Sequence, residues 1–155
     1  MNSAYPSSEK RTPPIRLLAV RAELHVFAGI VYWRQPLRLG LVLQGRAFVR
    51  IREQRGDSIG FDARPLEGAD LGEGGCVQVH DVTDRLDPRL RGAAIETLRT
   101  IGDGEGRTLG LALIRPGDHP FCIWVDDDEF YWGEEPILMA ALLRKGVRAR
   151  IGREI

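Results

Sequence analysis

The carboxylates and histidines are the residues of this chain whose types and spacing could support catalysis. Four consecutive acids form one acidic run: Asp126, Asp127, Asp128 and Glu129. Carboxylate oxygens bind hard divalent cations, and His80 or His119 could add a nitrogen ligand to the same centre. One hypothesis is therefore a small metal-dependent hydrolase or nuclease. No spacing among these residues matches a known set of metal ligands, so the sequence identifies no metal site.

An arginine-rich segment offers a different chemistry, the binding of anions. Residues 34–55 hold six arginines and one acid, Glu53. A β-hairpin in this segment would place four side chains on its outer face: Arg38, Phe48, Arg50 and Arg52. Guanidinium groups bind phosphates and carboxylates, and an aromatic ring among them can stack on a base. This face predicts contact with an acidic partner or, as an alternative, with nucleic acid, unless the arginines pair with the protein's own acids.

Aromatic residues follow the acidic run directly. Phe130, Tyr131 and Trp132 come immediately after it, and rings beside carboxylates are typical of protein-binding surfaces. The alternative is that residues 126–129 form the solvated tip of a hairpin, with Trp124 and Phe130 in the core. Both interpretations stay open at this point.

The two cysteines do not indicate nucleophilic or redox chemistry. Cys76 and Cys122 lie in apolar runs without C-x-x-C spacing, so we interpret both as reduced core residues. The chain has no G-x-S-x-G motif, and residues 72–75 lack the lysine and hydroxyl residue of a phosphate-binding loop. We expect no cofactor.

Composition predicts one ordinary globular domain. The chain has 155 residues, 43% of them hydrophobic and 28% charged, with a formal net charge of zero. Zero net charge gives no general affinity for nucleic acid or anionic membranes. Residues 1–14 are polar and rich in proline, which predicts a disordered lead-in to a single domain over residues 15–155. No apolar stretch approaches the roughly 18 residues that a membrane span needs, so we expect a soluble, cytoplasmic protein without a membrane partner.

The clearest structural signal is the hairpin that would position the arginines. Apolar residues alternate over residues 37–43 and again over 47–51, with Gly45 between the two runs. An odd loop of three residues places Leu41 opposite Val49, so that both face the core. We therefore predict this register, with a bulge at or beside Gly45.

Other strands are expected near residues 19–26, 59–64, 76–82, 108–114, 120–125 and 147–151. Two helices are expected, over residues 88–101 and 136–145, because Asp87-Pro88 and Pro136 begin apolar runs that end at glycine. The predicted fold is α+β, a mostly antiparallel sheet of five to seven strands with both helices packed on one face.

Segregated charge without an assembled catalytic motif favours a non-catalytic protein that acts by protein–protein interaction. An immunity-like or inhibitor role, in which the chain blocks another protein's site, fits these features. The expected contact residues are the arginine face, the acidic run and Trp132. The hydrolase and the nucleic-acid-binding hypotheses are the alternatives.

Overall fold

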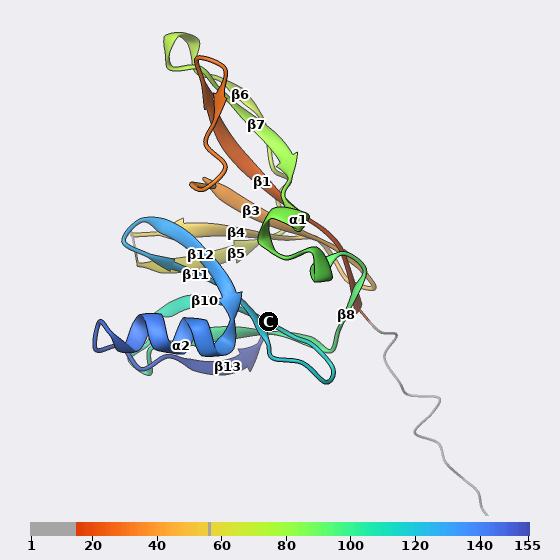
Figure 1. The fold of residues 1–155 in the computed structure, drawn as a ribbon, viewed down its shortest axis with the longest axis vertical. Coiled ribbons are helices and arrows are strands. Elements are labelled where there is room, and N and C mark those ends of the chain that lie inside the picture. The colour runs from red at the N-terminus through yellow and green to blue at the C-terminus, as the bar shows by residue number, and fades with distance from the viewer. Residues whose placement is uncertain (1–14, 56) are drawn as a thin grey trace, which may run out of the picture.

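β-Strands in two antiparallel sheets form most of this computed structural model, which describes residues 15–55 and 57–155 (Figure 1). The first sheet contains β1 (Ile15–Phe27), β2 (Ile30–Val31), β3 (Arg38–Gln44), β4 (Val49–Gln54), β5 (Ser58–Asp62), β6 (Ala69–Asp70), β7 (Cys76–Asp81) and β8 (Ala93–Ile95). The second contains β9 (Thr97–Gly102), β10 (Thr108–Ile114), β11 (Phe121–Asp126), β12 (Glu129–Glu134) and β13 (Arg150–Glu154). The α+β class and the antiparallel pairing are confirmed, but the 13 strands of the described chain exceed the five to seven expected. The predicted lead-in, residues 1–14, lies outside the described residues.

The main core lies between the two sheets. In the first sheet the strand order is β5-β4-β3-β1-β7-β6, and β2 and β8 also pair with β1. Leu39, Leu41 and Ile51 of this sheet share one buried cluster with Leu111 and Phe121 of the second sheet. Alternate residues of each strand point into this layer, as in other packed pairs of sheets.

A single longer helix, α2 (Glu135–Leu143), covers the outer face of the second sheet (Figure 1). Its Leu138 and Leu142 pack in a smaller core cluster that also holds Trp124 and Cys122. Pro136 stands in its first turn, where the missing N–H costs no helical hydrogen bond. The helix expected over residues 136–145 is thus confirmed.

The helix expected over residues 88–101 is wrong. Asp87 does accept a hydrogen bond from the Arg89 N–H, but the segment makes only the short 3-10 helix η3 (Pro88–Leu90). Gly92 then adopts a positive φ of 75°, and its N–H donates to the Leu17 carbonyl at 2.7 Å. From there the chain pairs as β8 with β1, and as β9 with β10 and β13. Long-range strand pairing has overridden a local helical pattern.

The predicted hairpin register is confirmed. β3 and β4 pair Leu41 with Val49 and Leu39 with Ile51. Gly45 has a positive φ of 93°, which suits a residue without a side chain at the tip. The pairing of β3 with β4 ends at Leu41 and Val49, so residues 42–48 connect the last pair, a longer connection than the three residues expected.

The first sheet extends beyond the sandwich as a projecting arm, which we define as residues 25–33 and 69–79 (Figure 1). β1 is 13 residues long, or roughly 40 Å at about 3.3 Å per residue. Its pairing with β3 ends at Glu23, whereas its pairing with β7 continues to Val26. The far end of β1 therefore leaves the sandwich with β2, β6, β7 and the 3-10 helix η2 (Gly72–Gly74).

The remaining helix is a single turn, α1 (Thr83–Leu86), which follows β7 at the base of the arm. No helix within residues 15–55 and 57–155 is long and apolar enough to cross a membrane.

Candidate functional site

The arginines of the hairpin face are paired with acids of the same sheet. Arg50 donates two hydrogen bonds to the Asp62 carboxylate, at 2.8 and 2.7 Å, and Arg52 donates a third at 3.3 Å. The hydrogen bond from Arg50 is the main reason that the pKa of Asp62 lies well below its usual range. A carboxylate between two guanidinium groups neutralises much of this face, which weakens the nucleic-acid hypothesis.

At the other end of the face, a second acid pairs with an arginine and a loop crosses over the sheet. Arg38 pairs at 2.7 Å with Glu23, whose other carboxylate oxygen accepts the Glu67 N–H at 3.0 Å. Residues 63–68 connect β5 at one edge of the sheet to β6 at the other edge. Phe48 lies over Gly40, which leaves no room for a β-carbon: one would come 2.8 Å from Cε2 of the ring. The Arg38–Arg52 surface is therefore well packed, and each of its three arginines has an acidic partner, although Arg50 and Arg52 share one.

The acidic run forms the turn between β11 and β12. Asp127 and Asp128 have positive φ angles of 52° and 66°, and Asp126 pairs with Glu129 across the strands. This geometry is that of a two-residue hairpin turn. Asp126 also makes an ion pair of 2.6 Å with Lys145, so part of the acidic charge is balanced as well.

The aromatic residues after this turn divide between the core and the surface. Phe130 is buried, and Trp132 is half-buried against the main core. Tyr131 points outward and stacks on Trp124, with 6.1 Å between the ring centroids. Of the three rings, only that of Tyr131 belongs to an exposed residue.

The two histidines do not join the acidic run. His80 Nε2 donates a hydrogen bond to Gln78 Oε1 at 2.8 Å, and the ring lies edge-on to Trp33. His119 lies in the turn between β10 and β11. Neither histidine lines the hollow that three residues of the acidic run form with Arg55, Asp57 and Lys145: Asp126, Asp127 and Asp128. Among the residues that the structure describes, no group of three or more histidines, cysteines or acids could hold a metal ion.

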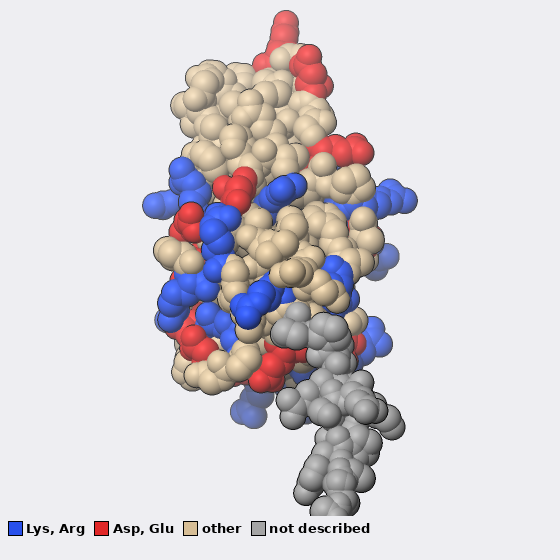
Figure 2. Space-filling model, turned by 90° about the vertical axis from the view of Figure 1, so that its right-hand side faces the viewer, with Lys and Arg blue, Asp and Glu red and all other residues tan. Residues whose placement is uncertain are grey.

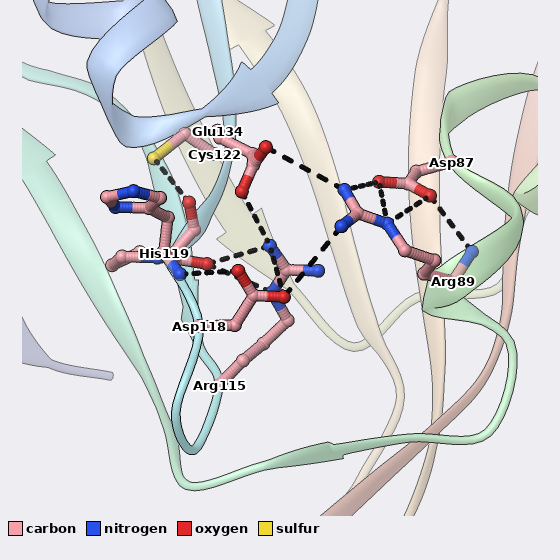
Figure 3. A network of polar contacts seen from close by, with 8 residues as sticks. Asp87, Arg89, Arg115, Asp118, His119, Cys122 and Glu134 are labelled. Atoms are coloured by element: carbon pink, nitrogen blue, oxygen red, sulfur yellow. Dashed lines mark hydrogen bonds and ion pairs between the residues drawn. The ribbon is translucent and has the colours of Figure 1, made fainter.

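A second polar cluster joins the end of β10, the β10–β11 turn, η3 and β12 (Figure 3). The Arg115 guanidinium donates to the His119 carbonyl at 2.7 Å and lies 3.5 Å from the Glu134 carboxylate. Cys122 is part of this cluster, but burial raises the pKa of its thiol to about 12. A thiol of that pKa is not a nucleophile near neutral pH. The cluster ties the β10–β11 turn to η3 and β12.

The arm carries the surface that the sequence interpretation missed. Five of the ten exposed large hydrophobic side chains in the described chain lie on it: Phe27, Ile30, Tyr32, Leu71 and Val79. Phe27 is 44% exposed and Ile30 58%. A group of this kind on a projection is typical of an interaction surface.

The arm carries few charged side chains, and all of them are acidic. Residues 25–33 contain no charged side chain, and residues 69–79 contain only Asp70 and Glu73. Figure 2 shows the upper part of the molecule almost free of charge, with acidic atoms near its end. The sequence feature that could have indicated this surface is the run of residues 25–33, which has no charged side chain in a chain that is 28% charged.

The arm is internally ordered, and a hollow lies beside each face of its base. His25 stacks on Tyr32 with 5.5 Å between centroids, and its Nε2 lies 2.7 Å from the Gly74 carbonyl oxygen. One hollow, of about 280 Å³, has Val79 and Arg21 in its lining. The other, of about 490 Å³, is lined partly by Trp33, on which the Arg85 guanidinium stacks. Both hollows could receive side chains of a bound partner.

Comparisons with known proteins returned no match: no family model, no curated protein and no solved structure resembles this chain.

Proposed function

We propose that this chain is a non-catalytic protein that acts by protein–protein interaction and that the arm is its contact surface. The observation that supports the proposal is the concentration of exposed apolar side chains on a projection without a single cation. An immunity-like or inhibitor role fits this shape, because a narrow projection can enter and block a cleft of another protein. The partner's cleft would have apolar walls and basic residues near Asp70 and Glu73.

The arginine face and the acidic run have smaller parts in this proposal. Arg38, Arg50 and Arg52 already have acidic partners, and pairing them again outside would cost the interactions that they make inside. The arm loses no such interactions, since Phe27 and Ile30 are in contact with solvent. Burial of exposed apolar side chains in a partner is favourable by about 25 cal/mol per Å².

The test is a pull-down with the tagged full chain from its native host at moderate salt, with bound protein and nucleic acid both identified. Ile30→Glu places a charge on the arm, beside the turn between β1 and β2, and Leu18→Glu places the same charge on an exposed leucine outside the arm. We expect a stoichiometric partner with the wild type and with Leu18→Glu, and at least a tenfold loss with Ile30→Glu, roughly 1.4 kcal/mol of binding free energy. The purified chain should also inhibit the activity of the captured partner.

Two results would contradict the proposal. One is recovery of nucleic acid alone. The other is a protein partner that Ile30→Glu still binds but that Arg52→Gln loses, which would move the contact to the hairpin face.

A further inference from the structure

A hollow of about 280 Å³ lies on the outer face of the first sheet, beside the loop of residues 63–68. One of its six lining residues is Arg21 of β1. The other five have apolar side chains: Phe48, Ala63, Pro65, Leu66 and Val79. Apolar walls with a polar group that can fix the orientation of a ligand are typical of a small-molecule site.

The walls of this hollow are held in place by contacts within the fold. A β-carbon at Gly40 would lie 2.8 Å from Cε2 of Phe48 and 3.1 Å from Cδ1 of Leu66, so both side chains pack closely on the sheet at this glycine. The loop is fixed by the Glu67 N–H, which donates to the Glu23 carboxylate at 3.0 Å. The hollow is therefore formed by the fold itself, without a ligand.

Arg21 is the charged residue of this hollow, and the acid nearest to it along the sheet is already in use. Its neighbours Val20 and Ala22 are buried in the core, so Arg21 lies on the opposite, outer face of β1. Asp81 of β7 stands directly across from it. The Asp81 carboxylate, however, accepts two hydrogen bonds from Arg91, both at 3.1 Å. Asp81 therefore pairs with Arg91 and not with Arg21.

The other acids of this face do not neutralise Arg21 either. Glu23 and Asp62 are paired with the hairpin arginines. Glu67 belongs to the loop but does not line the hollow. Within residues 15–55 and 57–155, the Arg21 side chain makes no ion pair and no hydrogen bond. Its charge is therefore available to an anion from outside the chain.

We propose that this hollow binds a small monocarboxylic acid with an apolar body. The Arg21 guanidinium donates to both carboxylate oxygens, which its planar fork matches. The apolar body lies against Phe48, Leu66 and Val79, whose walls supply the hydrophobic part of the affinity. One cation matches one carboxylate. The other lining side chains carry no hydrogen-bond donor, so nothing in the walls compensates the second charge of a phosphate.

This inference does not rest on the proposed function. The hollow lies at the base of the arm, and the exposed side chains Phe27 and Ile30 do not line it. The two ideas therefore fail separately. A chain that captures no protein partner can still bind the acid, and a chain that captures a partner through the arm need not bind one.

The test is a titration of the isotopically labelled full chain, followed by amide NMR. The probes are phenylacetate and octanoate, each compared with its neutral amide. We expect at least one of the acids to cause saturable shifts at the lining residues. Its amide should bind at least tenfold more weakly, roughly 1.4 kcal/mol, because the amide has the same apolar body but no charge for Arg21.

Variants separate the charge of the site from its walls. Arg21→Gln should weaken binding of the acid at least tenfold and leave binding of the amide unchanged, because only the ion pair is lost. Val79→Phe fills the hollow from β7 and should weaken both. Both replaced residues are exposed, so the variants should keep the melting temperature of the wild type.

Two controls change residues outside the hollow. Arg144→Gln removes an exposed arginine after the end of α2, and Ile30→Glu alters the arm; both should bind the acid like the wild type. The inference is overturned if neither acid shifts the lining residues or if each acid binds no better than its amide. It is also overturned if Arg21→Gln binds the acid as tightly as the wild type does.

Discussion

Asp62 should contribute more to stability than any exposed acid of this chain, because it neutralises the hairpin arginines. Its carboxylate accepts hydrogen bonds from Arg50, Arg52 and the Arg64 N–H. Side-chain exposure is 13% for Arg50 and 25% for Asp62, so this ion pair is intermediate between a buried and an exposed pair. Disruption of a buried pair costs about 3–5 kcal/mol, and an exposed pair contributes about 0–1 kcal/mol. We expect Asp62→Ala to lower the free energy of unfolding by about 2–3 kcal/mol, measured by urea unfolding with linear extrapolation.

The same variant tests the pH dependence. Since the pKa of Asp62 is lowered in the folded state, its contribution is complete above the unfolded pKa, about 4, and is lost as pH falls toward the lower folded value. The stability difference between wild type and Asp62→Ala should therefore shrink between about pH 5 and pH 2. Asp84→Ala, in which a 66% exposed carboxylate is removed, should cost less than about 0.5 kcal/mol. The reasoning is refuted if Asp62→Ala costs no more than this control, or if its effect does not change with pH.

Two further predictions concern the second sheet and the cysteines. Gly110→Ala should destabilise the protein by about 1–3 kcal/mol, because a β-carbon there would lie 2.8 Å from that of Trp124; Gly102→Ala, with its nearest contact at 3.4 Å, is the control in thermal unfolding. Thiol labelling at pH 8 should modify the half-buried Cys76 in the native protein and reach Cys122 only after unfolding, because Cys122 is fully buried and its pKa is raised to about 12. Equal melting temperatures for the two glycine variants, or rapid native labelling of both thiols, would contradict these expectations.

The hairpin and α2 could be predicted from sequence because their signals are local. Alternation of apolar residues fixes which face of β3 and β4 is buried, and the parity of the loop then fixes the register that pairs Leu41 with Val49. In α2, proline at the start and glycine after the end agree with the apolar run between them. Local preference and tertiary packing favour the same structure in both cases.

The segment 88–101 could not be predicted in this way because its outcome depends on distant strands. Leu90, Leu98 and Ile101 are buried in the structure, as their hydrophobicity indicates. Their spacing, which is typical of one face of a helix, does not correspond to a helix here. Gly92 was the local indication against a helix, since glycine in the interior of a helix is unfavourable. The segment forms strands because β1 and β10 offer backbone groups with which β8 and β9 pair. The sequence of the segment itself does not reveal those distant partners.

The candidate site was harder to predict than the fold. Sequence places the arginines on one face, but it does not reveal that Asp62 and Glu23 lie opposite them, because those contacts follow from strand order. The arm depends on how far β1 extends past β3, which is also a property of the assembled sheet. A charge-free run can be recognised in a sequence, but its exposure cannot.

The continuity of β1 gives the arm a mechanical property. One strand runs from the sandwich core to the tip of the arm, with no linker between the two parts. Backbone hydrogen bonds to β3 and then to β7 hold it along most of its length, so a paired strand that is shared with the core, and not a loop, carries the projection. A rigid projection has little orientational freedom to lose when it is captured, and that loss is one of the main costs of association. In the proposed interaction, the arm would present its apolar side chains in a direction set by the same strand that anchors the core.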